Sequence, residues 1–163
     1  VIRLDPGLAF GTGTHPTTRM CLQWIAANAH PWPRVLDYGC GSGILAIGAA
    51  LHGATGIDAV DIDDAAVQAT RDNAIANGVS LNAGRPEAAT GIYPLVLANI
   101  LATPLKLLAP LLSGHVAPGG HLVLAGILER QADELKAAYA PWIALEVSAR
   151  DDGWILMTGT RHP

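Results

Sequence analysis

The sequence predicts an α/β fold in which helices cover both faces of a mostly parallel sheet. Short apolar runs rich in branched side chains recur along the chain, and most are followed by a segment whose apolar residues have helical spacing. A glycine-rich loop joins the first run to its helix, and a short turn separates the last two runs. We therefore expect a Rossmann-like, doubly wound sheet of seven strands, closed by an antiparallel C-terminal edge hairpin.

Local signals place the individual elements. Gly78 is expected to end one helix, and residues 118–120 (Pro-Gly-Gly) are expected to form a turn. The expected strands are residues 34–38, 57–62, 79–83, 94–99, 121–125, 142–149 and 154–159. The expected helices are residues 17–29, 44–53, a segment capped by Asp63 or Asp64 and running to 77, 104–112 and 129–140.

Composition restricts the class of protein. The 163 residues fit one domain, 50% are hydrophobic and only 15% are charged, so a long disordered segment is excluded. No uninterrupted apolar run is long enough to span a membrane. The net charge of −4 and the lack of a Lys/Arg-rich run do not indicate nucleic-acid binding. Neither the two cysteines nor the six histidines have metal-ligand spacing, and with no expected signal peptide the predicted location is the cytoplasm.

The glycine loop, residues 39–43 (GCGSG), predicts the cofactor. Its glycines, Gly39, Gly41 and Gly43, allow positive φ and let backbone N–H groups approach a ligand. The spacing differs from the dinucleotide pattern G-x-G-x-x-G, and Asp37 precedes the loop by two residues. A carboxylate there would repel a pyrophosphate but would attract the ammonium and sulfonium groups of S-adenosylmethionine. S-adenosylmethionine is therefore the predicted cofactor, and a nicotinamide-dependent oxidoreductase is disfavoured.

Two further polar residues end predicted strands. Asp61 follows the glycine loop by about 20 residues, where an acid can accept hydrogen bonds from both ribose hydroxyls. Its neighbours are better explained otherwise, Asp58 as a strand residue and Asp63 as a helix cap. Asn99 ends the fourth main strand, where its amide oxygen could orient an attacking amine. A helix N-cap is an equally good explanation of Asn99 from spacing alone.

Five segments together resemble one known family. They are residues 4–18 (LDPGLAFGTGTHPTT), 37–47 (DYGCGSGILAI), 60–63 (VDID), 98–102 (ANILA) and 113–128. In this order they resemble the methyltransferases that modify ribosomal protein L11. The first segment is more specific than the glycine loop, which most methyltransferases of this fold share.

The resemblance implies an S-adenosylmethionine-dependent N-methyltransferase whose partner is ribosomal protein L11, modified on lysine side chains or the N-terminal amine. It implies cofactor contacts at Thr18, Gly39, Asp61 and Asn99, and a loop over residues 10–18 that folds over the cofactor. Thr18 by itself would be interpreted as a helix-start residue. Family members carry an additional N-terminal substrate-recognition domain, so we expect residues 1–163 to be the catalytic domain only.

Alternatives remain open. The same fold could methylate nucleic-acid amines or glutamine side chains, because asparagine also ends this strand in such enzymes. A truncated domain that binds cofactor without activity is a further alternative. His15 is expected to pack in its loop rather than act as a base, and Cys40 to be a small residue of the glycine loop rather than a nucleophile. Trp24, Trp142 and Trp154 are expected to pack at the core or sheet edge.

Overall fold

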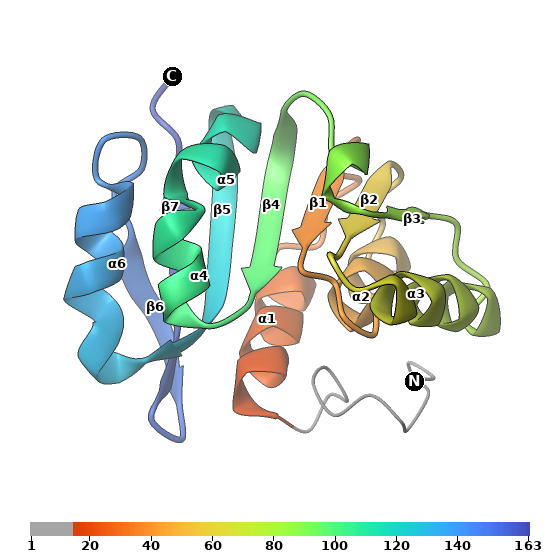
Figure 1. Ribbon diagram of the computed structural model, residues 1–163, viewed down its shortest axis with the longest axis horizontal. Helices are drawn as coiled ribbons and strands as arrows, with labels where there is room; N and C mark the ends of the chain where they lie inside the picture. Colours follow the sequence, from red (N-terminus) through yellow and green to blue (C-terminus); the bar gives the residue numbers. More distant parts are fainter. Residues whose placement is uncertain (1–14) are drawn as a thin grey trace.

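A computed structural model describes residues 15–163 and contains a seven-stranded mixed sheet with strand order β3-β2-β1-β4-β5-β7-β6 (Figure 1). The first five strands are parallel, and β7 pairs antiparallel with both β5 and β6. The mostly parallel sheet and the C-terminal hairpin are as predicted. The strands are β1 (Val35–Tyr38), β2 (Ile57–Val60), β3 (Asn82–Gly84), β4 (Tyr93–Asn99), β5 (Val116–Leu128), β6 (Glu146–Asp151) and β7 (Trp154–Thr160).

Helices lie on both faces of the sheet (Figure 1). The α-helices are α1 (Pro16–Ala27), α2 (Ile44–Leu51), α3 (Asp64–Ala76), α4 (Ala102–Leu107), α5 (Ala109–His115) and α6 (Ala132–Tyr139). Two short 3-10 helices, η1 (Pro86–Ala88) and η2 (Glu129–Gln131), complete the elements. Asp63 caps α3 by accepting a hydrogen bond from the Ala65 N–H at 2.9 Å, and Gly78 follows α3 at φ +66°, both as predicted.

Alternate residues of the central strands enter two separate cores, one on each face of the sheet. Leu95 and Leu97 of β4 pack with α1 and α2, whereas Val96 and Ala98 pack with α4, α5 and α6. This alternation explains why the central strand is a continuous apolar run rather than an apolar-polar pattern. Trp24 and Trp154 contact the first core and Trp142 the second, as expected. Asp37 lies beside Leu97 in the β1–β4 pairing, and Asn99 follows Leu97 by two residues on β4. Both side chains therefore point to the face of the sheet that α1 and α2 cover.

Helix α1 runs antiparallel to β5. Its first turn meets the β6–β7 hairpin, where the His15 ring stacks edge-on against Trp154 at 5.3 Å and Arg19 pairs with Asp151 at 3.1 Å. Trp154 pairs with Leu128, at the carboxyl end of β5. The first turn of α1, which contains Thr18, therefore lies at the edge of the sheet where the parallel strands end.

One predicted helix is two. The prediction of a single helix over 104–112 is wrong, because α4 ends at Leu107 and α5 begins at Ala109. Pro110 explains the break, since a proline has no N–H to continue the α4 hydrogen-bond ladder but is tolerated in the first turn of α5. The predicted helix over 129–140 also begins as the 3-10 turn η2 before it becomes α6.

Several strand boundaries also differ from the prediction. β3 begins at Asn82 rather than 79, and β6 begins at Glu146 rather than 142. β5 begins at Val116 rather than 121. The predicted turn at 118–120 lies within this strand, where several residues leave the pairing with β4. There the pairing with β4 passes from Val116 directly to His121. Gly119 at φ +77° permits this departure from the pairing.

Three further features concern membranes, metals and thiols. Within residues 15–163, no helix is long and apolar enough to cross a membrane. The same part of the chain contains no group of three or more His, Cys, Asp or Glu side chains arranged to hold a metal ion. Cys21 and Cys40 are both buried as free thiols.

Candidate cofactor site at the carboxyl edge of the sheet

The glycine loop connects β1 to α2 through three residues with positive φ. Gly39, Gly41 and Gly43 have φ values of +78°, +54° and +85°. The Gly39 and Cys40 N–H groups donate to the Val60 carbonyl oxygen at 2.8 and 2.9 Å, which fastens the loop to the end of β2. Gly43 is the N-cap of α2 and supplies no capping side chain. The loop is thus held in a tight turn before α2 that leaves Gly39 and Gly41 partly exposed, so a ligand could approach the backbone closely there.

The three glycines have different surroundings. A Cβ at Gly39 would lie 2.6 Å from Ile100 Cγ2, and one at Gly43 would lie 2.8 Å from Thr70 Cγ2. A Cβ at Gly41 would meet no atom within 4 Å. Gly39 and Gly43 are therefore required by protein packing, whereas Gly41 borders open space that a ligand could occupy.

Asp61 lies beyond β2 and holds the loop. One carboxylate oxygen accepts from the Gly41 N–H at 3.0 Å and the other from the Asp63 N–H at 2.9 Å. Each oxygen has a second lone pair, so the carboxylate keeps the capacity to accept from a ribose diol. The structure thus places Asp61 beside the glycine loop, as predicted.

Asp37 lies near the carboxyl end of β1 and is buried, with 1% of its surface exposed. Its carboxylate accepts from the Ala46 N–H at 3.2 Å, in the first turn of α2. Burial, opposed by this hydrogen bond and reinforced by the negative charge of Asp61, raises the pKa of Asp37 to about 7. A cation placed beside this carboxyl would favour its ionised form.

Asn99 and Thr18 each bury a polar side-chain atom without a partner. Asn99 Oδ1 and Thr18 Oγ1 are inaccessible to water and have no hydrogen bond within the part of the chain that the structure describes. Leu101, not Asn99, is the N-cap of α4, so the helix-cap explanation of Asn99 is wrong. A buried acceptor without a partner costs about 1–3 kcal/mol, which a ligand that donates a hydrogen bond would recover.

Two hollows adjoin these residues. A narrow one of about 30 Å³ is lined by Asp37, Asn99 and the start of the glycine loop. A wider groove of about 470 Å³ begins at Asp61 and has an almost wholly apolar wall. That wall consists of Tyr38, Ile62, Pro86, Ile100, Pro104, Leu107 and Leu108. A ribose held by Asp61 would therefore have the narrow hollow, with the polar side chains of Asp37 and Asn99, on one side and an apolar surface suited to a flat base on the other.

The apolar wall was not predicted from the sequence. Ile62 is 74% exposed and Leu107 is 79% exposed, so both are unusual surface residues. The available signal was an apolar residue within two positions of a strand end, as at Ile62 and Ile100. Glu87, the one acid considered for the adenine amine, does not line the groove.

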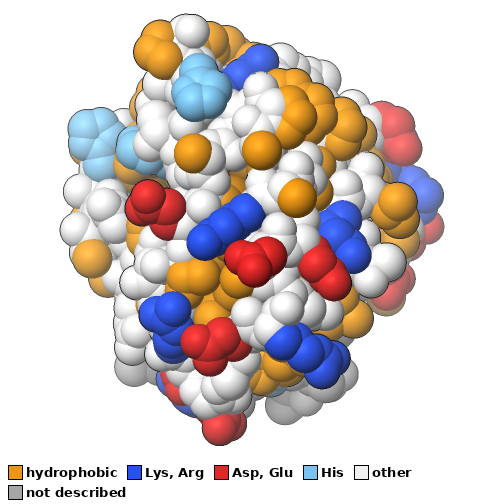
Figure 2. All heavy atoms as spheres, turned by 90° about the vertical axis from the view of Figure 1, so that its left-hand side faces the viewer, with side chains coloured by type: hydrophobic (Ala, Val, Ile, Leu, Met, Phe, Trp, Pro, Cys, Tyr) orange, Lys and Arg blue, Asp and Glu red, His pale blue; other side chains and the backbone are white. Residues whose placement is uncertain are grey.

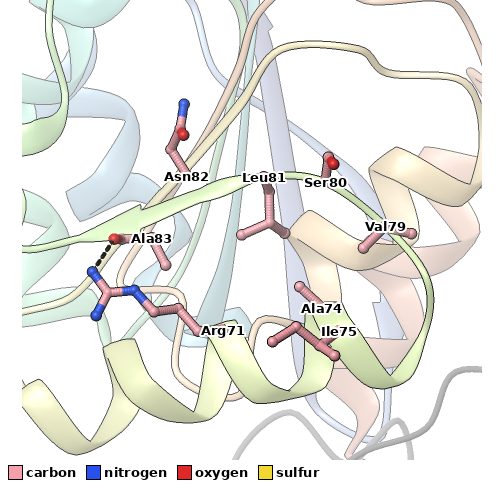
Figure 3. A pocket seen from close by; sticks show the side chains of 8 residues that line it. All are labelled: Arg71, Ala74, Ile75, Val79, Ser80, Leu81, Asn82 and Ala83. Atoms are coloured by element: carbon pink, nitrogen blue, oxygen red, sulfur yellow. Dashed lines mark hydrogen bonds between the residues drawn. The ribbon is translucent and has the colours of Figure 1, made fainter.

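Another hollow of about 470 Å³ lies between α3 and β3 (Figure 3). Arg71 crosses it and donates to the Ala83 carbonyl oxygen at 2.8 Å, while Leu81, Ala74 and Ile75 supply apolar side chains. None of its lining residues belongs to the glycine loop or to the ends of β1 and β4. We therefore do not assign the cofactor to this hollow.

His15 and Cys40, which were not expected to act as a base or a nucleophile, both have structural roles. His15 is the N-cap of α1, with Nδ1 accepting from the Thr17 N–H at 3.2 Å. Cys40 is buried with its thiol 3.3 Å from Thr70 Oγ1, and burial raises the pKa of that thiol to about 12. A protonated buried thiol is a poor nucleophile. Residues 10–14 of the loop expected to cover the cofactor lie outside the described residues.

The fold and the glycine loop place the chain in the class of Rossmann-like methyltransferase folds. Residues 1–162 match the family "Ribosomal protein L11 methyltransferase (PrmA)". The chain belongs to this family, as its sequence motifs suggested.

Individual relatives agree. The chain is 72% identical over 160 residues to the ribosomal protein L11 methyltransferase of Polaromonas sp., which covers 96% of this chain and 54% of that protein. It is 59% identical over 161 residues to the one from Bordetella parapertussis, covering 98% and 52%. The chain thus spans about half the length of these curated relatives.

Solved structures show the same fold. A ribosomal protein L11 methylase from Lactobacillus delbrueckii subsp. bulgaricus superposes with a TM-score of 0.89 at 35% identity, covering 99% of this chain and 86% of that one. A 16S rRNA N2 G1207 methyltransferase of T. thermophilus, solved with AdoMet and guanosine, has a TM-score of 0.77 at 19% identity. It covers 96% of this chain and 46% of that one. The second likeness supports the fold alone.

Proposed function

We propose that residues 1–163 form the catalytic domain of an S-adenosylmethionine-dependent N-methyltransferase that acts on amines of ribosomal protein L11. Membership of the family supports methyl transfer to ribosomal protein L11, and lysine side chains or the N-terminal amine are the proposed acceptors. The single observation that carries the proposal in this chain is the buried, unpartnered Oδ1 of Asn99 in the hollow that also contains Asp37 and the glycine loop.

The residues present fit S-adenosylmethionine. Asp61 would accept hydrogen bonds from its ribose hydroxyls, and the open side of Gly41 would allow close approach of its methionine part. Asp37 would face its cationic groups, and the apolar groove beyond Asp61 would take its adenine. Thr18 Oγ1, buried and unpartnered, supplies a further polar group at the same edge. Thr18, Asp37, Gly39, Gly41, Gly43, Asp61 and Asn99 are the proposed cofactor-site residues.

The bound cofactor supplies an electrophilic methyl group on a sulfonium centre. The protein's part is positioning. Asn99 Oδ1 accepts a hydrogen bond from the attacking amine, which directs the nitrogen lone pair toward the methyl group. The amine must be neutral to attack. His15 is a helix cap and Cys40 is a buried thiol, so neither is placed to act as a base. We therefore assign the amine's proton to bulk water.

Transfer of labelled methyl from S-adenosylmethionine to purified ribosomal protein L11 tests the proposal. We expect Asn99→Ala to lower the rate by about 100-fold or more, because one oriented group near a reacting centre contributes on this scale. Asn28→Ala is the matched control, since Asn28 is an exposed residue at the end of α1 whose side chain donates to the Trp24 carbonyl oxygen. Full activity of Asn99→Ala would contradict the assignment of Asn99.

The same assay separates the alternatives. Labelling of RNA or DNA in preference to L11 would favour a nucleic-acid substrate. On the face over α6, however, acidic and basic side chains lie interleaved (Figure 2), as in the Lys106–Glu134 and Arg150–Glu129 pairs at 3.1 and 2.8 Å. That face offers no uniform basic strip for phosphates. Calorimetric binding of cofactor without labelling of any substrate would favour an inactive cofactor-binding domain.

A cytoplasmic location belongs to the same proposal. Cys21 and Cys40 are buried free thiols, which suits a reducing compartment. A ribosomal protein is also a substrate of that compartment. The protein can be isolated from cells, unfolded and treated with a thiol reagent. Labelling of both Cys21 and Cys40 would show that they are reduced in the cell and would support this location.

A further inference from the structure

We propose that Ile100 is a positioning residue, held between two glycines, that sets the separation between the cofactor loop and Asn99. The inference rests on the proposed function, since it assigns a role within the same site. It is carried by two close approaches, one on the side-chain face of Ile100 and one on its backbone.

The side chain of Ile100 stands against the glycine loop. Ile100 Cγ2 occupies the place that a Cβ on Gly39 would need, with only 2.6 Å between the two positions. Gly39 is itself fixed by the hydrogen bond from its N–H to the Val60 carbonyl at 2.8 Å. The β-branch of Ile100 therefore packs directly on a loop that is anchored to β2 and cannot move away freely.

The backbone of Ile100 stands against β5. Gly126 has φ +88°, and a Cβ there would collide with the Ile100 carbonyl oxygen and lie 2.6 Å from its carbonyl carbon. A bulge in β5 makes this approach possible. From Leu124 to Ile127, β5 advances three residues while its partner β7 advances two, so β5 contains one extra residue. The extra residue bends β5 toward Ile100 at the point where the β4 pairing ends, at Asn99 and Ala125.

Ile100 is thus fixed from two directions, and its neighbour in the chain is Asn99. Asn99 Oδ1 makes no hydrogen bond within residues 15–163, so no polar contact described there holds the amide. The backbone of Asn99 is held by its pairing with Ala125 on β5 and by its link to the fixed Ile100, so Ile100 contributes to where that oxygen lies relative to the cofactor loop. Since a displacement of about 1 Å can lower a rate by about 100-fold, this packing has a direct effect on methyl transfer.

Two substitutions separate positioning from simple filling of space. Ile100→Val keeps Cγ2 and loses only the terminal methyl, whereas Ile100→Leu keeps the volume and loses the β-branch. Because Ile100 also lines the apolar groove, we expect both variants to change kcat, Val the less, by about threefold, since it keeps the contact of Cγ2 with Gly39. We expect Leu to lower kcat by about tenfold or more, with the KM for S-adenosylmethionine changed by less than about threefold. Equal kcat values for the two variants, or effects confined to KM, would overturn the inference.

A glycine pair provides the second test. Gly126→Ala introduces a methyl group against the Ile100 backbone, whereas Gly119→Ala, on the same strand at φ +77°, places its methyl group within 4 Å of nothing. Both substitutions carry the strain of a positive φ, so the difference between them reports the contact with Ile100. Lower kcat in the Gly126 variant alone is expected. Equal kcat in the two variants would contradict the inference, and if Gly126→Ala does not fold, the Val and Leu pair decides.

A readout without catalysis keeps this inference separate from the proposed function. With S-adenosylhomocysteine bound, the side-chain amide resonances of Asn99 should coincide in wild type and Ile100→Val and shift in Ile100→Leu. Unchanged resonances in the Leu variant would overturn the positioning role, whatever the substrate. Absence of L11 methylation by the wild type, with the resonance shift present, would instead overturn the proposed function alone.

Discussion

The two edges of the sheet treat polar groups in opposite ways. At the amino edge, Arg34 donates to the Ile92 and Thr90 carbonyls at 2.8 and 2.7 Å and lies 4.0 Å from the centre of the Tyr93 ring. The Tyr93 hydroxyl donates to Asp58 at 2.6 Å, and Asp58 also pairs with Arg34 at 3.6 Å. We refer to Arg34, Asp58 and Tyr93 as the amino-edge cluster. Its charged and hydroxyl groups satisfy one another.

At the carboxyl edge, polar groups are buried without such partners. Thr18 Oγ1 and Asn99 Oδ1 have none within residues 15–163, and the buried Asp37 carboxyl accepts from a single backbone N–H. Groups satisfied within the protein stabilise the fold, whereas groups left unsatisfied cost stability until a ligand binds. Among the described residues one further buried side-chain atom lacks a partner, Ser113 Oγ in α5, just before β5 begins. It lines neither hollow at the carboxyl edge. The amino-edge cluster therefore contributes to folding, whereas Asn99 stands unpartnered in a hollow where a ligand could bind.

The largest expected effect concerns Asp37. Its pKa of about 7 in the folded protein lies above its ordinary value, so between about pH 4 and 7 the folded chain retains a proton that the unfolded chain has lost. The free energy of unfolding contributed by this carboxyl is therefore fully present at low pH and is lost as the pH rises through 7. The loss should be on the order of a few kcal/mol.

Chemical unfolding of wild type and Asp37→Asn at pH 5 and pH 8, without cofactor, measures this contribution. The amide cannot ionise and can still accept from the Ala46 N–H. The stability of Asp37→Asn relative to wild type should therefore increase from pH 5 to pH 8. The same relative stability at both pH values would show that Asp37 does not titrate in this window, and would weaken the contrast between the edges.

A smaller effect is expected at the amino edge. Arg34→Ala removes two hydrogen bonds to carbonyls and the contact with the Tyr93 ring, so it should lower the free energy of unfolding by about 2 kcal/mol. The affinity for S-adenosylhomocysteine should change by less than about twofold, because the amino-edge cluster lies at the opposite end of the strands.

Denaturant unfolding and calorimetry check these two expectations, with Arg130→Ala as the control for loss of an exposed arginine. A large loss of cofactor affinity in Arg34→Ala, with stability unchanged, would reverse the roles given to the two edges.

Much of the site could be predicted because its signals are local. The glycine loop, Asp37 and Asp61 follow strands whose apolar runs identify them, and parallel strands bring their carboxyl ends to one edge. The mostly parallel sheet and the C-terminal hairpin also follow from the alternation of strands and helices and the turn at Asp151–Gly153, whereas the strand order was not predicted. The cap at Asp63 and the stop at Gly78 follow from residue type alone.

What could not be predicted depends on contacts between distant segments. The role of Ile100 arises from Gly39 and Gly126, and nothing in the residues around Ile100 indicates either approach. The sequence left Asn99 undecided between a helix cap and a site residue until the true cap, Leu101, was known. The break at Pro110 is a different case. The proline itself indicates a break, but the apolar residues on both sides of it have helical spacing, which predicted a single helix.

The most direct test of the contrast is a titration of the isotopically labelled protein with S-adenosylmethionine, followed through backbone amide resonances. We predict that the amides of Gly39, Gly41 and Asp61 shift, whereas those of Arg34 and Tyr93 do not. Shifts centred on the amino-edge cluster, or none around the glycine loop at saturating cofactor, would contradict the assignment of the carboxyl edge as the binding site.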